Sequence, residues 1–313
     1  MPLIIDHISK SFQEVRALDQ VSLEVLDGEL FGLIGPDGAG KSTLFRIMAS
    51  LLVPDTGSCI MQGHDVVKDY REVRKIIGYM PGRFSLYMDL SVEENLEFYA
   101  RVFGTSVSEN YELVREVYEQ IAPFRKRLAR KLSGGMKQKL ALSCALIHRP
   151  RILLLDEPTT GVDAVSRVEF WEMLKNIQQQ GITIVVSTPY MDEAEKCDRV
   201  ALFQKGKLLG ITDPAHPAEE GASLLYSLGS SRGVYPYLAR IRETDGCMHA
   251  WLFGDRIHVT LRSEADAVHT GSVIRSWGDP TLTWEPIAPS IEDRFMGWMA
   301  MESNELINGR EAG

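Results

Sequence analysis

The segment GPDGAGKST, residues 35–43, has the residue types and the spacing of a loop that binds phosphate. It follows the apolar run LFGLI and precedes TLFRIMASLL, so a strand would lead into the loop and a helix would follow it. Glycines let the backbone curl until its N–H groups point at phosphate oxygens, and the helix N-terminus adds positive potential. Lys41 would reach the β- and γ-phosphates of a nucleoside triphosphate, and the Ser42 hydroxyl would hold Mg²⁺. The expected nucleotide contacts are Gly35, Pro36, Asp37, Gly38, Ala39, Gly40, Lys41, Ser42 and Thr43.

A second candidate group stands at the end of the apolar run RILLLDEP, residues 151–158. A buried strand there would deliver two adjacent carboxylates at its carboxyl end, where ligands of open α/β sheets bind. Asp156 would hold Mg²⁺, directly or through water, and Glu157 would polarise the attacking water. Such a pair alone is typical of a loop in solvent, but together with the phosphate loop it predicts a hydrolytic site.

The segment LSGGMKQ, residues 132–138, stands just before a run of helix-forming residues. Ser133 can cap that helix, while Gly134 and Gly135 leave their N–H groups unshielded for an anion. Alone, this pattern predicts a turn and a capped helix. Its place some twenty residues before the acidic strand makes the three motifs together highly specific.

Short apolar runs alternate with longer helical segments through the first two thirds of the chain. This alternation predicts an α/β architecture, a parallel sheet covered by helices. The basic run 125–131 is interpreted as one solvated face of a helix. The expected strands are 30–34, 151–155, 182–186 and 200–203, and the expected helices are 91–103, 110–121, 135–148 and 165–180.

A boundary between two domains is expected in TDPAHPAEEG, after the hairpin-like FQKGKLLG of residues 203–210. We therefore place one domain at 1–213 and a small α+β domain at 214–313. The second domain is expected to run strand, helix, two strands joined at Gly254-Asp255, helix and strand, followed by a helix that opens on Ser290. It contains no cluster of catalytic character.

Composition excludes several classes of protein. Apolar residues make up 44% and charged residues 25% of the 313, as in soluble globular proteins, and the net charge of −9 argues against a grip on DNA or RNA. No apolar run approaches the roughly 18 residues that cross a bilayer, and the start lacks a secretory signal, so a cytosolic chain is expected. The four cysteines, Cys59, Cys144, Cys197 and Cys247, lie far apart, which predicts buried small residues and not a zinc site or a disulfide framework.

Over roughly residues 3–210 the chain resembles the ATP-binding subunits of ABC transporters, through the three motifs above and the GVD of residues 161–163. The resemblance implies a P-loop NTPase of the ABC type, with a mixed sheet, a helical subdomain at about 83–148, and ATP with Mg²⁺ as its ligands. It also implies that two such domains close head to tail, so that Ser133, Gly134 and Gly135 serve the partner's ATP. Asp163 belongs to the same set of nucleotide contacts. Phe12 falls where the family places an aromatic residue on adenine; the alternative is a core residue on an edge strand.

Within the family the chain looks most like the ATPases of ABC-2 type and multidrug exporters, and like one half of their tandem ATP-binding proteins. The segments GYMPGRFSLYMDLSVEENL, STPYMDEAEKCDRV and PSIEDRFM carry this likeness. It implies a membrane-spanning permease on another polypeptide, facing the stretch from Gly82 to about Leu90. The chain would then lie at the cytoplasmic face of the cell membrane, paired with a second ATPase domain as a homodimer or a heterodimer.

Two positions depart from the family pattern: Gly82 stands where a Gln is usual, and Pro189 where a His is usual. Neither residue can make the polar contact to the reacting end of ATP that the usual side chain makes. Removing one such contact typically costs about 10²- to 10³-fold in rate. The sequence therefore predicts a site that binds ATP and hydrolyses it slowly, in an asymmetric pair; the rival is a homodimer that relies on Glu157 alone.

Two other functions remain open at this point. One is a regulatory module that closes on nucleotide with little hydrolysis. The other is a soluble ABC ATPase not coupled to transport, which is disfavoured because such proteins usually carry two ATPase domains or long coiled coils.

Overall fold

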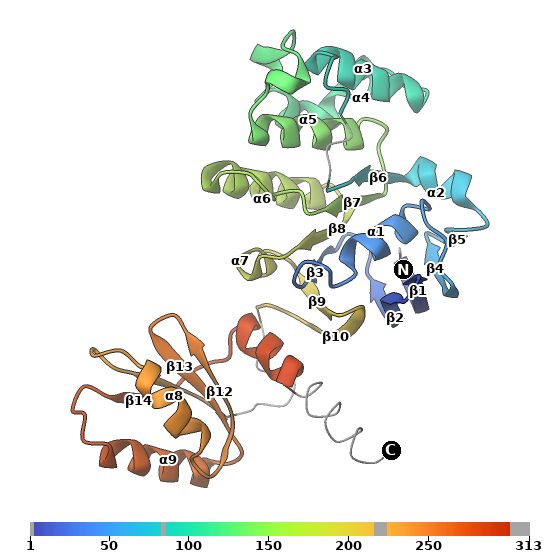
Figure 1. Cartoon of the computed structure of the whole chain (residues 1–313). Helices are drawn as coiled ribbons and strands as arrows, with labels where there is room; N and C mark the ends of the chain where they lie inside the picture. Colours follow the sequence, from blue (N-terminus) through green and yellow to red (C-terminus); the bar gives the residue numbers. More distant parts are fainter. Residues whose placement is uncertain (1–2, 83–85, 216–223, 301–313) are drawn as a thin grey trace. The chain divides into compact units, whose positions relative to one another are not determined.

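The computed structural model describes residues 3–82, 86–215 and 224–300 (Figure 1). The chain forms two compact units, Met1–Pro214 and Ala215–Gly313. Each has a hydrophobic core of its own.

The first unit contains two sheets that pack against a common core. The smaller sheet has the order β2-β1-β4-β5, and all of its pairs are antiparallel. Helix α1 (Lys41–Met48) lies against both sheets: Leu44 and Phe45 are fully buried beside apolar residues of each. The strands of the smaller sheet are β1 (Leu3–Phe12), β2 (Val15–Val25), β4 (Thr56–Met61) and β5 (His64–Asp65).

The larger sheet has the order β10-β9-β3-β8-β7-β6, and only its β9–β10 pair is antiparallel. This mixed sheet confirms the α/β fold class, and it contains each of the four strands expected from the apolar runs. The β9–β10 hairpin pairs Gln204 with Lys207, as FQKGKLLG predicts. The strands are β3 (Leu30–Ile34), β6 (Ile77–Met80), β7 (Ile152–Asp156), β8 (Thr183–Thr188), β9 (Arg199–Gln204) and β10 (Lys207–Thr212).

Register in the larger sheet brings four strand ends to one edge. Ile34 pairs with Thr188, Asp156 with Ser187, and Met80 with Leu155. Because these strands are parallel, the chain leaves all of them at the same side of the sheet, where open α/β folds bind ligands.

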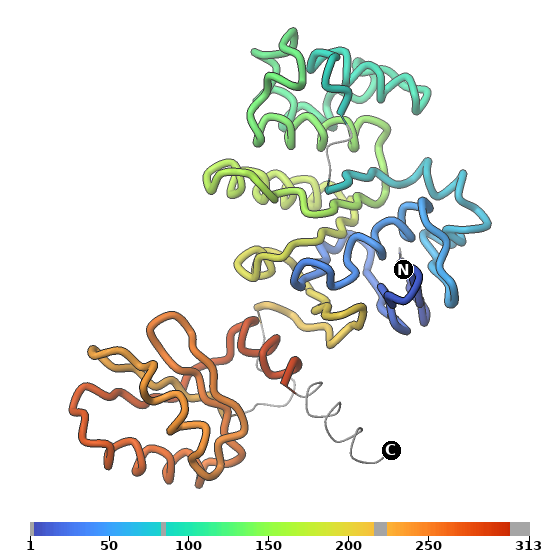
Figure 2. Tube along the Cα trace, viewed as in Figure 1, coloured from blue at the N-terminus to red at the C-terminus, as the bar shows by residue number. Residues whose placement is uncertain are grey.

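Three helices pack against one another as a group beyond strand β6: α3 (Val92–Val102), α4 (Val107–Tyr118) and α5 (Gly134–Leu146) (Figures 1 and 2). Capping boxes at Ser91 and Ser106 start α3 and α4, and the Ser133 hydroxyl accepts a hydrogen bond from Met136 N at the start of α5. These side chains satisfy N–H groups that a helix end leaves unpaired. The unit also contains α2 (Tyr70–Ile76), α6 (Ala164–Gln179) and the short α7 (Met191–Ala194).

The interpretation of residues 125–131 as one helical face is wrong. The run directly follows one short 3-10 helix, Ala122–Phe124, and contains a second, Ala129–Lys131. Its basic side chains are exposed, as expected, but Ala129 is buried and its N–H donates to Leu90 O. Pro123 and this tertiary hydrogen bond favour tight turns over a continuous helix.

The second unit has an antiparallel sheet in the order β12-β13-β11-β14 and helices that pack on it. The order of elements is the one that the sequence predicts, and a further helix over residues 291–300 begins after Ser290, whose hydroxyl accepts from Asp293 N. The elements are β11 (Leu224–Gly229), α8 (Tyr235–Arg242), β12 (Cys247–Phe253), β13 (Arg256–Leu261), α9 (Glu264–Ser276) and β14 (Thr283–Pro286).

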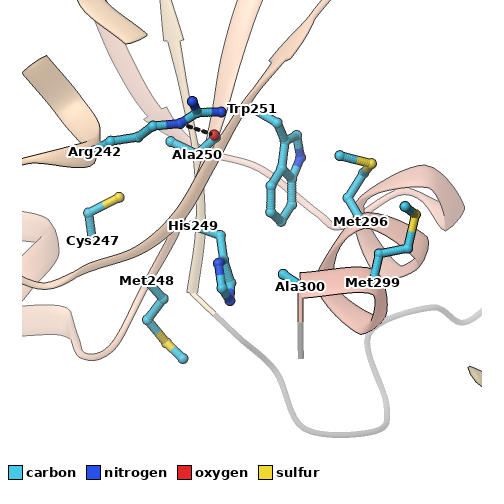
Figure 3. A pocket seen from close by; sticks show the side chains of 9 residues that line it. All are labelled: Arg242, Cys247, Met248, His249, Ala250, Trp251, Met296, Met299 and Ala300. Atoms are coloured by element: carbon cyan, nitrogen blue, oxygen red, sulfur yellow. Dashed lines mark hydrogen bonds between the residues drawn. The ribbon is translucent and has the colours of Figure 1, made fainter. Parts of the chain in front are cut away.

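A pocket of about 440 Å³ separates strand β12 from the helix of residues 291–300 (Figure 3). His249 and Trp251 stack at 5.9 Å and face Met296 and Met299 across it. In Figure 3, Cys247 and Met248 lie on one side of His249 and Met296 and Met299 on the other, so the labelled sulfur atoms do not converge on one point.

Three of the four cysteines are buried, and Cys247 is half-buried. Burial raises the pKa of the Cys59, Cys144 and Cys197 thiols, as expected of small core residues. Across the described ranges, no helix has both the length and the apolar character that crossing a membrane requires.

Candidate active site

The phosphate loop joins the end of β3 to the start of α1 and needs glycine at two crowded positions. A Cβ on Gly35 would lie 2.2 Å from Phe203 O. Gly40 has φ +104°, and a Cβ there would lie 2.4 Å from Ala17 O. The loop can therefore pack tightly against the neighbouring strands only because these residues lack side chains.

Lys41 is 3% exposed, and its ammonium group points back into the loop. Its Nζ donates to Gly35 O at 2.6 Å and to Pro36 O at 3.1 Å, and lies 3.6 Å from Glu157 Oε1. The structure thus brings together the basic residue of the phosphate loop and the acidic residue that follows strand β7. This contact unites two motifs that are 116 positions apart, from residue 41 to residue 157.

Asp156, at the end of β7, is 4% exposed and lies at the centre of a chain of hydroxyl contacts. Its Oδ1 accepts from Ser42 Oγ at 3.1 Å and from Ser187 Oγ at 2.7 Å. The Glu157 N–H in turn donates to Ser187 Oγ at 2.9 Å. Ser187, on β8, therefore fixes both acidic residues, because it donates to one and accepts from the backbone of the other.

Glu157 has φ +50°, which is uncommon for a residue other than glycine. Its amide also donates to Ser187 O at 3.2 Å, so two hydrogen bonds to β8 hold this backbone conformation. Unusual backbone conformations held in this way cluster at active sites. The partly exposed carboxylate faces Lys41 at the edge of the phosphate loop.

Gly82 lies beside the acidic pair. A Cβ at this position would be 3.2 Å from Asp156 O and 3.8 Å from Asp156 Oδ2. Pro189 follows the last residue of β8 and is half-buried. Both departures from the family pattern therefore stand at the strand ends that carry the candidate catalytic groups.

The motif LSGGMKQ and the GVD segment form a second group. A Cβ on Gly135 would lie 2.7 Å from Ser166 Oγ, and one on Gly134 would lie 3.3 Å from Gly161 O. Asp163 caps α6 by accepting from Ser166 N at 3.0 Å, and this hydrogen bond holds the pKa of its carboxyl below the usual range. The described residues that line the phosphate-loop pocket include none of this second group.

Phe12 is 44% exposed at the end of β1, which lies inside its sheet between β2 and β4. The alternative of a core residue on an edge strand is therefore wrong. Its hairpin partner is Val15, which lines the phosphate-loop pocket of about 440 Å³. This places Phe12 next to the pocket rim, and its stacking on adenine stays a prediction.

Sequence reasoning missed several residues of the site. Val15, Arg16, Ala17 and Lys205 line the pocket with the phosphate loop, and Ser187 connects the two acidic residues. A polar residue at the carboxyl end of an apolar strand, as in IVVST, is the signal that could have pointed to Ser187.

The comparisons with known proteins agree with this geometry. A family profile described as ABC transporter matches residues 18–160. The chain is 38% identical over 273 residues to the probable multidrug ABC transporter ATP-binding protein YbhF of Escherichia coli (strain K12), covering 86% of this chain and 46% of that protein. It is 35% identical over 269 residues to the Nod factor export ATP-binding protein I of Rhizobium sp. (strain N33), covering 82% of this chain and 88% of that protein. The chain belongs to the ATP-binding proteins of ABC transporters.

This membership confirms the resemblance on which the motifs were assigned. The chain spans about half the length of YbhF, 46%. A solved ATP-binding subunit of an ABC transporter superposes with a TM-score of 0.63 at 26% identity, over 68% of this chain and 90% of that one. The dimeric structure of the bacterial ABC transporter cassette MJ0796 gives a TM-score of 0.62 at 26% identity, over 67% and 98%. The fold is therefore that of the ABC-type P-loop ATPase.

Proposed function

We propose that this chain is the ATP-binding and ATP-hydrolysing subunit of an ABC exporter of the ABC-2 or multidrug type. The observation that carries the proposal is the contact of Lys41, in the phosphate loop, with Glu157, whose amide is fixed by Ser187. The names of the relatives support export, since they are called multidrug and Nod factor export proteins.

In this proposal Lys41 holds the β- and γ-phosphates of ATP, and Ser42 and Asp156 hold Mg²⁺. A hydroxyl oxygen and a carboxylate oxygen 3.1 Å apart are the hard ligands that Mg²⁺ prefers, so these residues fit the ion. The ion would neutralise charge on the phosphates. Glu157 would accept the proton of the attacking water, because its carboxylate faces the loop and its backbone is fixed by Ser187.

The site is expected to be slow. Position 82 borders Asp156, and position 189 follows the strand that carries Ser187, yet Gly82 and Pro189 offer no polar side chain to the γ-phosphate. Ground-state binding would depend on the phosphate loop, which is complete.

Two partners belong to the proposal. A second ABC ATPase domain would complete each ATP site, since Ser133, Gly134 and Gly135 stand apart from this chain's own phosphate-loop pocket. The relative MJ0796 is described as dimeric.

The membrane-spanning permease would dock near Gly82. Of the expected contact stretch, residues 83–85 lie outside the described part of the chain. Tyr87 is 48% exposed and packs edge-on against Phe98 with 4.5 Å between ring centroids, and Tyr99 packs edge-on against Phe98 at 5.6 Å. This aromatic cluster, formed by the expected contact stretch and helix α3, suits an apolar partner helix and would hold the chain at the cytoplasmic face of the membrane.

The test is steady-state hydrolysis of Mg-ATP by the purified chain and by Glu157→Gln, with ATP binding measured in both samples. We expect slow turnover in the wild type, none in the variant, and equal binding. Turnover that is the same in both would remove Glu157 from the catalytic role. Binding without any turnover in the wild type would leave the chain as a regulatory module that closes on nucleotide.

A further inference from the structure

A fully buried acidic residue, Glu193, connects the segment that carries Glu157 with the segment that carries Pro189. It is 0% exposed and sits in the short helix α7. Its Oε2 accepts from Thr159 Oγ1 at 3.0 Å and also from Thr188 Oγ1. Thr159 is two residues after Glu157, and Thr188 is the residue before Pro189.

The same carboxylate also reaches helix α6. Arg167 Nε lies 3.8 Å from Glu193 Oε1, and this oxygen has no hydrogen-bond partner. The Arg167 guanidinium also stacks on the Tyr190 ring at 4.7 Å. Three segments, the loop after β7, the end of β8 and the first turns of α6, therefore meet at one acid.

Stability does not explain this arrangement. A buried ion pair usually costs as much in desolvation as it gains, and replacement by apolar side chains is often neutral or stabilising. A buried carboxylate oxygen without a hydrogen bond is a further cost. Buried polar groups that are retained in spite of such costs are found where a loop must keep one conformation.

Thr188 shows what the carboxylate fixes. Its hydroxyl donates to Glu193 and accepts from Tyr190 N at 3.1 Å, so the backbone on both sides of Pro189 is held in place. On the other side, Thr159 is 2% exposed, and its carbonyl accepts from Val162 N at 3.2 Å, which closes the turn after Glu157.

We infer that Glu193 is a positioning residue for ATP hydrolysis: through Thr159 and Thr188 it holds the Glu157 loop and the Pro189 segment at the distance that catalysis requires. The inference rests on the proposed hydrolytic function. Glu193 should affect the chemical step and not ATP binding, because the side chains that donate to its carboxylate, Thr159 and Thr188, lie outside the phosphate loop.

The experiment compares Glu193→Met with Glu193→Gln in the full chain. Met keeps the bulk and removes the acceptor, so the two loops lose their common anchor. Gln keeps a carbonyl oxygen that can accept from both threonines. A displacement of about 1 Å at a catalytic group costs about 10²-fold. We expect kcat to fall about 10- to 100-fold in Glu193→Met and to recover to within about 3-fold in Glu193→Gln, with KM and ATP affinity unchanged.

Asp192→Asn is the matched control. Asp192 is the adjacent carboxylate; its Oδ2 lies 3.6 Å from a guanidinium nitrogen of Arg167, and its side chain is 71% exposed. The hydroxyls of Thr159 and Thr188 donate to Glu193 and not to Asp192. It should leave kcat unchanged. Thr159→Val, which removes one of the two hydroxyls at constant shape, provides a second variant should Glu193→Met fail to fold, and should lower kcat in the same direction.

Hydrogen exchange makes the test independent of turnover. The amide N–H groups of residues 157–163 other than Pro158, and of residues 188–191 other than Pro189, should exchange faster in Glu193→Met than in the wild type and in Asp192→Asn. Unchanged exchange in these segments overturns the inference, as does an unchanged kcat in an active enzyme. If the wild type hydrolyses no ATP, the proposed function fails, and the exchange result still decides the role of Glu193.

Discussion

The substitution Gly82→Gln should make the site faster. In the structure, a Cβ at position 82 would lie 3.2 Å from Asp156 O and 3.8 Å from Asp156 Oδ2, so a longer side chain would begin beside the carboxylate proposed to hold Mg²⁺. Gly82 is not among the glycines with positive φ, so the backbone accepts a side chain there. The 3.2 Å contact requires the neighbouring strand end to move by only a few tenths of an ångström.

The size of the gain follows from the value of one polar contact in a transition state, about 10²- to 10³-fold or about 2.7–4 kcal/mol. We expect kcat to rise about 10²-fold, at the lower end of this range, because the small backbone shift and the missing contact at Pro189 both reduce the benefit. The affinity for ATP should change little, since the Gln side chain would reach Mg²⁺ and the attacking water and not the nucleotide itself.

The assay is steady-state release of phosphate at saturating Mg-ATP, with Gly82→Met as the control. Met has the length of Gln without its amide, so any effect of bulk alone appears in both variants. The gain should also vanish when Glu157→Gln is added, because the new contact assists the same attack. Equal rates for Gly82→Gln, Gly82→Met and the wild type, with ATP bound in all three, would refute this account of the slow site.

Three other substitutions test the phosphate loop and the second unit. Lys41→Met should weaken ATP binding by about 10²-fold or more in a titration, since it removes a buried charge that faces the phosphates, and truncating such a charge costs about 2–5 kcal/mol. Gly35→Ala should lower the stability of the first unit by about 1–3 kcal/mol in urea unfolding, because its Cβ would lie 2.2 Å from Phe203 O. Asp279→Asn should make the free energy of unfolding of the second unit fall less steeply at acid pH. Hydrogen exchange of the β11 amides as a function of pH measures this. Hydrogen bonds from Thr281 and Tyr237 lower the pKa of Asp279 to about 2, so its contribution is complete above pH 3.8 and is lost as the pH falls toward 2.

Each of the three has a control. Glu72→Gln, which changes an exposed residue of α2, should leave ATP affinity unchanged. Gly63→Ala changes a glycine with nothing within 4 Å of its Cβ, so it should cost less than Gly35→Ala, although its φ of +83° still causes some strain. Asp255→Asn is the control for Asp279→Asn. A loss of slope in that control equal to the loss in Asp279→Asn would contradict the assignment.

The sequence predicts the second unit, and four strands and four helices of the first, because their signals are local. The antiparallel sheet β2-β1-β4-β5, strand β6 and helix α2 were not among the expected elements. Apolar runs of strand length and capping residues such as Ser91, Ser133 and Ser290 lie within a few positions of the elements that they start. The phosphate loop is equally local, since one segment contains both its glycines and Lys41. The basic run 125–131 was misinterpreted because the hydrogen bond from Ala129 to Leu90 is a tertiary contact that no pattern in the run reveals.

The rest of the site depends on the register of the sheet. The pairing of Asp156 with Ser187 and of Ile34 with Thr188 places residues from distant segments at one edge. A single sequence shows that Ser187 ends an apolar strand, but not that its hydroxyl donates to Asp156. The burial of Glu193, within an acidic segment typical of a solvated helix, is visible only once the strands are assembled.

A single-turnover experiment tests the central claim, that this chain binds ATP and hydrolyses it slowly through Glu157. The chain, in excess over labelled ATP and with Mg²⁺, is quenched at increasing times, beside Glu157→Gln treated in the same way. The account predicts that both proteins retain the nucleotide, that the wild type converts it slowly to ADP, and that the variant leaves it as ATP. Conversion at the same rate in both proteins, or failure of the wild type to retain ATP, would contradict it.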